Sequence, residues 1–180
     1  MITVGPVLFI IGLLMSLLAV AMGLPAIADL ATGNPDWQVF AGSAAVSLFV
    51  GVSLMLTTRS TSMTNLNLRQ AFLLTTMSWV AVAAVGALPF AFSELEISVA
   101  DAFFESMSGI TTTGSTIIVG LDNAPPGILL WRALLQWLGG VGIIVMAMAM
   151  LPILSVGGMQ LFRTEAVSYT HLRAHETRPY

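Results

Sequence analysis

The sequence predicts an all-α membrane protein, in which two leading transmembrane helices precede one helix–re-entrant loop–helix repeat. Hydrophobic residues make up 57% of the 180 residues and charged residues only 8%. A soluble domain normally has about a quarter of its residues charged, so this chain cannot cover a globule with polar groups. Four long apolar stretches and one short, helix-like apolar stretch then define the elements. We therefore expect the chain to lie in lipid.

Composition also excludes several classes of function. The chain has no cysteine and no lysine, and its two histidines, His171 and His175, lie within the last ten residues. The apolar body therefore has no thiolate or imidazole for a metal site or for acid–base chemistry. A net charge of −3 argues against nucleic-acid binding. We expect no enzyme activity and no bound cofactor.

The four apolar stretches are each long enough to cross a bilayer core, which takes about 20 helical residues. They cover residues 4–27, 39–56, 71–92 and 128–154. The first is too long for the apolar region of a signal peptide and has no basic residue before it. Three parts follow from this division: residues 1–62 as the leading pair, residues 63–166 as the repeat, and residues 167–180 as a polar tail.

The orientation of the spans follows from the arginines, because cytoplasmic loops retain positive charge. Arg59 and Arg69 bracket the loop between the second and third spans, and Arg163 follows the fourth. The acidic residues of the body fall on the other side: Asp29, Asp36, Glu94, Glu96, Asp101, Glu105 and Asp122. An even number of spans then places both termini in the cytoplasm.

The segment between the third and fourth spans, residues 93–127, contains a short predicted helix. Ser98 and Asp101 have the spacing of a capping box, with Ser98 as N-cap and Asp101 reaching back to it. Gly109 is placed as the C-terminal stop. About ten helical residues span only ~15 Å, which is half a bilayer. We therefore expect this helix to enter the membrane and stop there.

A threonine-rich run follows the short helix. Irregular backbone at membrane depth is tolerated where protein buries it or where it lines a watery path. Consecutive threonines disfavour helix, and Gly114 permits a backbone conformation that other residues resist. Rings of carbonyl groups from such a run replace the water shell of K⁺, and the negative end of the short helix favours a cation. The predicted re-entrant pore loop has five candidate K⁺ ligands: Thr111, Thr112, Thr113, Gly114 and Ser115.

Simpler interpretations exist for several of these features. A Ser/Thr/Gly-rich run between spans is often a plain loop, and the outer acids are often solvated loop charges. Arg132, the only charge in the fourth span, either snorkels to the headgroups or pairs with Glu105 or Asp122 to support the filter. The cluster of Gly139, Gly140 and Gly142 is best explained by close helix approach.

Three blocks carry a resemblance to a known family. Residues 106–115 between two spans resemble the first pore repeat of the TrkH/TrkG/KtrB potassium transporter family. Residues 112–116 stand in place of the channel signature TVGYG, of which Thr112 and Gly114 are retained. Residues 130–143 and 151–163 are similar to the second helix of that repeat and its cytoplasmic end. The two leading spans match the extra pair in TrkH-type members.

The resemblance implies potassium uptake across a bacterial cytoplasmic membrane, with K⁺ as the transported ion. Family members place four repeats around one pore, so this chain would supply one quarter of the filter and would need the remaining three repeats. The implied partners are membrane lipid, a second copy in a homodimer and a cytosolic TrkA-type nucleotide-binding subunit. A glycine at position 114 implies a preference for K⁺.

Two rival functions remain open from sequence. One is a small subunit that forms a homotetrameric cation channel, and the other is an accessory membrane subunit without an ion path. The tail, residues 167–180, does not resemble the family, and we expect it to have no function. We also expect that the 180-residue chain does not transport on its own.

Overall fold

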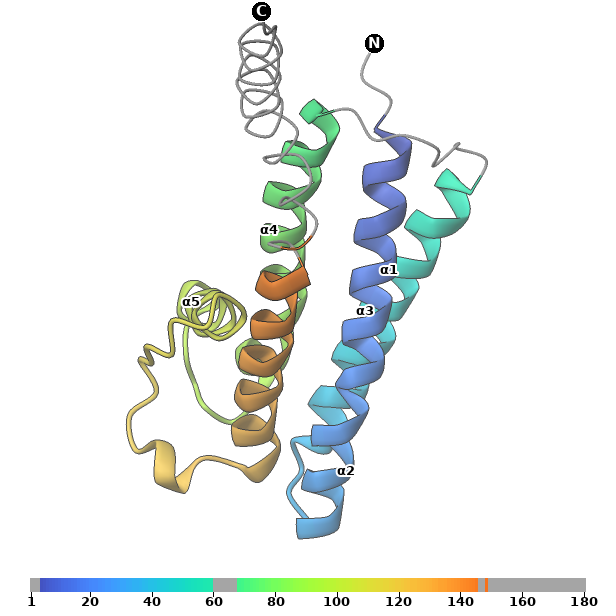
Figure 1. The fold of residues 1–180 in the computed structure, drawn as a ribbon. Coiled ribbons are helices and arrows are strands. Elements are labelled where there is room, and N and C mark those ends of the chain that lie inside the picture. Colours follow the sequence, from blue (N-terminus) through green and yellow to red (C-terminus); the bar gives the residue numbers. More distant parts are fainter. Residues whose placement is uncertain (1–3, 60–67, 146–147, 149–180) are drawn as a thin grey trace, which may run out of the picture. The chain divides into compact units, whose positions relative to one another are not determined.

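The computed structural model describes residues 4–59, 68–145 and 148, and every described element is helical or irregular. The helices are α1 (Gly5–Ala21), α2 (Gly23–Thr32), α3 (Trp37–Thr58), α4 (Leu68–Phe92), α5 (Val99–Ile110), the short 3₁₀ helix η1 (Leu121–Asn123) and a last helix, Pro126–Val145. Figure 1 shows α1 beside α3, and α5 as a short helix to one side of α4. The chain forms two compact units, Met1–Gly140 and Val141–Tyr180, and all contacts below lie within the first.

The four predicted spans are confirmed as apolar helices. Four segments are long and apolar enough to cross a membrane: Gly5–Thr32, Trp37–Thr58, Arg69–Phe92 and Pro126–Val145. The predicted end of the fourth span and the whole 167–180 tail lie outside the described residues.

The first span is interrupted near its end, where α1 stops at Ala21 and α2 starts at Gly23. Pro25 lies in the first turn of α2. Proline has no N–H group, and its ring clashes with the carbonyl group four residues earlier, which here belongs to Ala21. The two helices are therefore consecutive parts of one span.

α1 and α3 approach each other closely through small residues. A Cβ added to Gly51 would lie 2.7 Å from the Gly12 carbonyl oxygen, and one added to Gly12 would lie 2.6 Å from the Gly51 carbonyl oxygen. Small residues are the usual means of close helix packing in membranes. The leading helices are therefore held together without charged groups at this crossing.

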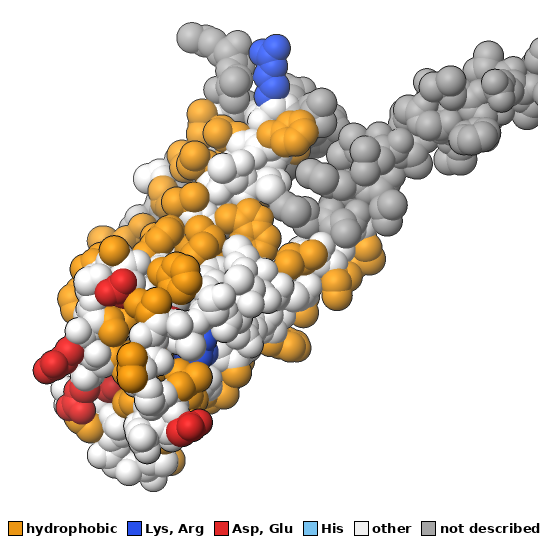
Figure 2. Space-filling model, turned by 90° about the vertical axis from the view of Figure 1, so that its left-hand side faces the viewer, with side chains coloured by type: hydrophobic (Ala, Val, Ile, Leu, Met, Phe, Trp, Pro, Cys, Tyr) orange, Lys and Arg blue, Asp and Glu red, His pale blue; other side chains and the backbone are white. Residues whose placement is uncertain are grey.

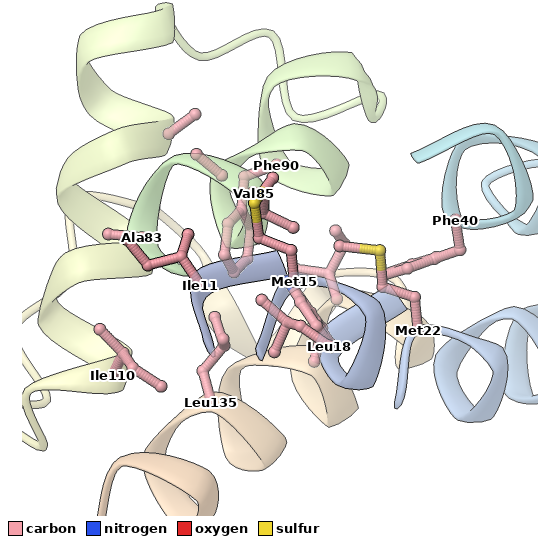
Figure 3. Close-up of a cluster of buried hydrophobic side chains, with 14 of the residues drawn as sticks. Ile11, Met15, Leu18, Met22, Phe40, Ala83, Val85, Phe90, Ile110 and Leu135 are labelled. Atoms are coloured by element: carbon pink, nitrogen blue, oxygen red, sulfur yellow. The ribbon is translucent and has the colours of Figure 1, made fainter. Parts of the chain in front are cut away.

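A buried apolar cluster joins the leading helices to the repeat. Figure 3 shows Ile11, Met15 and Leu18 of α1 together with side chains from the later helices. Phe90 of α4 and Leu135 of the last helix are both fully buried in this cluster. The leading helices and the repeat thus share one core.

Charged residues separate toward the two ends of the described helices. Arg59 caps the C-terminal end of α3, and Arg69 lies in the first turn of α4. The connections that carry most acidic residues lie at the other end of these helices, where Figure 2 shows the carboxylates gathered. This distribution matches the charge asymmetry expected from the sequence.

Candidate functional site

α5 begins with a side-chain cap from Ser98. The Asp101 backbone N–H donates to Ser98 Oγ at 3.2 Å, and the Ser98 hydroxyl donates to Asp101 Oδ2 at 2.7 Å. The Asp101 carboxylate therefore accepts a hydrogen bond from the Ser98 hydroxyl group. In a standard capping box, the corresponding side chain accepts from the backbone N–H group of the N-cap residue. The cap fixes the first residue of a helix only 12 residues long, about 18 Å at 1.5 Å per residue.

The C-terminal end of α5 differs from the expectation that Gly109 stops it. The helix runs through Ile110, with Thr111 as C-cap, so Gly109 lies within it. A Cβ on Gly109 would lie 3.1 Å from the Leu135 Cβ atom, so this glycine serves close packing against the last helix. The chain leaves the helix at Thr112, whose φ of 59° is left-handed. A β-branched residue with positive φ is a genuine outlier and marks backbone strain.

Residues after Thr112 fold back along α5. The N–H groups of Thr113 and Gly114 both donate to the Ser108 carbonyl oxygen, at 3.0 and 3.3 Å. The Ser108 hydroxyl donates to the Ser115 carbonyl oxygen at 2.6 Å. Gly114 has a φ of 78°. Residues 105–117 thus form a hairpin of one helix and one extended segment, which we call the filter hairpin after the filter expected from the sequence.

A buried carboxylate holds the far end of the filter hairpin. Glu105 Oε1 accepts hydrogen bonds from the Thr116 hydroxyl and from the Ile117 backbone N–H, both at 2.6 Å. Glu105 Oε2 lies 3.0 Å from Arg132 Nε. The Glu105 side chain is 0% exposed and that of Arg132 is 11% exposed. The sequence left open whether Arg132 snorkels to the headgroups or pairs with Glu105 or Asp122. In the structure, Arg132 forms the ion pair with Glu105.

The last helix packs against the α5 part of the filter hairpin. A Cβ on Gly139 would overlap the Ile110 carbonyl group, whereas one on Gly140 would meet nothing within 4 Å. The close helix approach expected of the glycine cluster therefore occurs at Gly139, where the last helix meets α5. The Trp131 indole N–H donates to the Gly86 carbonyl oxygen at 2.9 Å, which joins this helix to α4. Arg132 follows Trp131 directly.

The five predicted K⁺ ligands lie together in one segment. Thr111 bonds through its hydroxyl to the Met107 carbonyl oxygen at 2.7 Å and to the Thr113 hydroxyl at 2.8 Å. Residues 112–117 are exposed to solvent in the isolated chain. Within residues 4–59 and 68–145, no group of three His, Cys, Asp or Glu residues is arranged to hold a metal ion. Any ion at this segment would therefore meet backbone and hydroxyl oxygens.

Sequence reasoning missed two contributors to this site. Ser108 supplies both the carbonyl that accepts two N–H groups and the hydroxyl that binds Ser115. Asp29 of α2 accepts a hydrogen bond from the backbone N–H of Gly127, 98 residues away in the chain. In the sequence, Asp29 follows the first predicted span, residues 4–27, as one of the outer acids, and no pattern there pairs it with Gly127.

Comparison with known proteins assigns the family. Residues 36–175 match the TrkH family model, described as a cation transport protein, and this match includes part of the polar tail. The Trk system potassium uptake protein TrkH of Escherichia coli K12 is 46% identical over 157 residues, which cover 87% of this chain and 32% of that protein. The TrkI protein of Halomonas elongata is 40% identical over 166 residues, covering 92% and 34% respectively.

A solved structure agrees with these sequence matches. The crystal structure of the potassium transporter TrkH from Vibrio parahaemolyticus superposes with a TM-score of 0.81 at 40% identity, covering 95% of this chain and 37% of that one. The chain spans about a third of the length of the curated relatives that it matches. The chain belongs to the TrkH family of cation transport proteins, which is a family of transporters and not of enzymes.

Proposed function

We propose that this chain supplies one quarter of a K⁺-selective filter in a Trk-type potassium uptake protein of the bacterial cytoplasmic membrane. The proposal rests on the convergence of the Thr113 and Gly114 N–H groups on the Ser108 carbonyl oxygen. In a planar trans peptide the N–H group points opposite to the C=O group. The carbonyl groups of Thr112 and Thr113, which share these two peptides, therefore both face away from α5.

Two adjacent carbonyl groups on one side make a cation site when several copies surround an axis. Stripping a monovalent ion of water without replacement costs tens of kcal/mol, and rings of carbonyl oxygens supply that replacement. Gly114, with its φ of 78°, permits the required turn of the backbone. The α5 C-terminal end adds a partial negative charge beside the segment.

The five candidate ligands differ in how well their geometry suits this role. Thr112 and Thr113 present outward carbonyl groups, and Thr111 lies next to them at the end of α5. The Ser115 carbonyl faces the Ser108 hydroxyl, so Ser115 is the weakest of the five. Glu105 and Arg132 would hold residues 111–115 in place.

In the full assembly this chain would have further repeats, partner subunits and a fixed orientation in the membrane. Three further repeats would complete the ring, and the assembly would be a homodimer on a cytosolic TrkA-type regulatory subunit. The end that carries Arg59 and Arg69 would face the cytoplasm, with both termini on that side. The filter hairpin would then enter from the outer face as a re-entrant loop.

The test uses a chimera in which this chain replaces the homologous N-terminal third of the Escherichia coli relative. Gly114→Ala places a Cβ at a φ of 78°, and Gly120→Ala is a matched control because Gly120 has a φ of 72° and lies outside the filter hairpin. We expect Gly114→Ala to abolish K⁺ uptake and Gly120→Ala to keep it. Equal uptake by both variants would refute the filter.

A second experiment separates this proposal from its rivals. The 180-residue chain alone should not rescue growth of a potassium-uptake mutant in low K⁺. Rescue, together with a discrete tetramer after cross-linking, would instead establish the homotetrameric channel. Normal uptake by the Gly114→Ala chimera would favour the accessory subunit without an ion path.

A further inference from the structure

Asp29 is a carboxylate buried between the leading helices and the start of the last helix. Its side chain is 0% exposed, and Oδ1 accepts the Gly127 backbone N–H at 2.6 Å. Its second oxygen, Oδ2, is buried and has no hydrogen-bond partner among the described residues. A buried, partly unsatisfied carboxylate is unfavourable, so packing alone does not account for an aspartate here.

The contact falls where the last helix starts. The Leu129 N–H donates to the Pro125 carbonyl oxygen at 3.1 Å, which makes Pro125 the N-cap and Pro126 the first helical residue. Neither proline has an N–H group, so Gly127 carries the first free donor of this helix. Asp29 takes that donor as a capping residue supplied from another helix.

The lack of a side chain at Gly127 makes room for the Asp29 carboxylate. A Cβ at Gly127 would overlap the Asp29 carboxylate. The backbone can therefore reach Asp29 only because residue 127 has no side chain. A negative carboxyl group at a helix N-terminus is also favoured by the helix dipole.

A second buried contact lies one turn further along the last helix. Phe40 of α3 packs edge-on against Trp131, with ring centroids 6.2 Å apart and ring planes at 73°. Both side chains are 0% exposed. The next residue is Arg132, which holds Glu105 and through it Thr116 and Ile117.

We propose that Asp29 is a positioning residue for ion selection, which fixes the last helix so that Arg132 can hold Glu105 and the filter hairpin. The leading helices then act on selectivity without touching the ion. This inference rests on the proposed function of the filter hairpin.

The test measures the ratio of K⁺ to Na⁺ uptake in the chimera, together with the thermal unfolding midpoint of the purified protein. Asp29→Ala removes the cap, and we expect the ratio to fall between about twofold and about thirtyfold, the factor that corresponds to one helix cap. Asp29→Asn keeps an acceptor oxygen and should stay within about twofold of the parent, since the cap survives. Asp122→Asn is the control for loss of an exposed outer charge and should leave the ratio unchanged.

A double-mutant cycle adds a readout that general damage would not give. Gly127→Ala should lower the ratio in the parent, because its Cβ meets the Asp29 carboxylate, and should have little further effect in the Asp29→Ala background. Independent effects of the two changes would overturn the proposal.

A native ratio in Asp29→Ala, even with a lower unfolding midpoint, would also overturn it. If Asp29→Ala does not accumulate, Gly127→Ala, whose Cβ displaces the Asp29 carboxylate, carries the same prediction and the same refutation. Gly114→Ala in the same chimera keeps the two proposals apart. If it abolishes K⁺ uptake while the Asp29 variants keep the parental ratio, the filter stands and the positioning role fails.

Discussion

The crossing of α1 and α3 and the filter hairpin are stabilised in different ways. The α1–α3 crossing joins two regular helices, and Gly12 and Gly51 let their backbones approach without any charged group. The filter hairpin joins a helix to an extended segment, and Glu105 fixes it with two hydrogen bonds and an ion pair. Regular helices satisfy their own backbone groups, whereas an extended segment needs partners.

Each of the two regions therefore tolerates a different kind of change. Space is the limiting property where two helices cross, because their backbone groups are already bonded. Polar partners are limiting in the filter hairpin, because the N–H groups of its extended part depend on the Ser108 carbonyl group and the Glu105 carboxylate. Changes of size should therefore affect stability at the crossing, and changes of polar partners should affect transport at the filter hairpin.

The largest expected effect is that of Glu105→Leu, which removes both hydrogen bonds and leaves Arg132 without its partner. Breaking a buried ion pair costs about 3–5 kcal/mol, which is at least about a hundredfold in an equilibrium. We expect K⁺ uptake by the chimera to fall by this factor at equal expression. Glu105→Gln keeps an acceptor for Thr116 and Ile117 and should be intermediate.

The exposed carboxylate of Asp122 provides the control for that experiment. Asp122→Leu should transport at the parental rate, because no ion pair of Asp122 is present among the described residues. Normal uptake by Glu105→Leu would show that the filter hairpin does not need its polar support.

A smaller effect is expected for Gly139→Ala, whose Cβ would overlap the Ile110 carbonyl group at the end of α5. Overpacking costs about 1–3 kcal/mol, so uptake by the chimera should fall about fivefold or more. The neighbouring Gly140→Ala is the matched control, since a Cβ there meets nothing within 4 Å. Similar losses in both variants would mean that close approach to Ile110 does not set the effect.

At the helix crossing, Gly51→Ala should reduce stability without changing ion preference. Its Cβ would lie 2.7 Å from the Gly12 carbonyl oxygen, and the unfolding free energy in detergent should fall by about 1–3 kcal/mol. Gly42→Ala on the same helix meets nothing within 4 Å and should be neutral or stabilising. A changed K⁺/Na⁺ ratio in Gly51→Ala would break the distinction between the two regions.

The smallest expected effect concerns Asp36, at the start of α3. Burial raises the pKa of Asp36 above its ordinary value of 3.8, with repulsion from Glu94 and Asp29 acting in the same direction and a backbone hydrogen bond at Glu94 opposing it. The folded chain therefore holds this proton to higher pH than the unfolded chain does. Its stability should fall as pH rises from about 3.8 through the raised value, and then level off.

Asp36→Asn removes this dependence. The unfolding free energy of the variant relative to the parent should increase over that pH range and be constant above it, as measured by denaturation in detergent at several pH values. Parallel curves for parent and variant would show that Asp36 does not contribute to the pH dependence.

Local signals were enough to predict the spans and the start of α5. The four spans follow from their length and low charge, and Ser98 from its capping-box spacing to Asp101. The end of α5 was placed wrongly at Gly109, because sequence favours glycine at a left-handed position and gives no reason to expect Thr112 there.

The supports of the site depended on tertiary structure. Asp29 and Gly127 are 98 residues apart, and Glu105 bonds a residue 12 positions later across the turn of the filter hairpin. No periodicity in the sequence relates such pairs. Arg132 was identified as unusual, but only the packing of the last helix against α5 selects Glu105 over Asp122 as its partner.

The left-handed φ of Thr112 has a consequence for the evolution of this segment. A branched residue in this conformation costs about 1–3 kcal/mol, and a change to glycine or asparagine would relieve it. Selection for folding alone would therefore replace this threonine over generations. Its persistence in a lineage would be evidence that natural selection favours the threonine for transport, at the expense of a more stable chain.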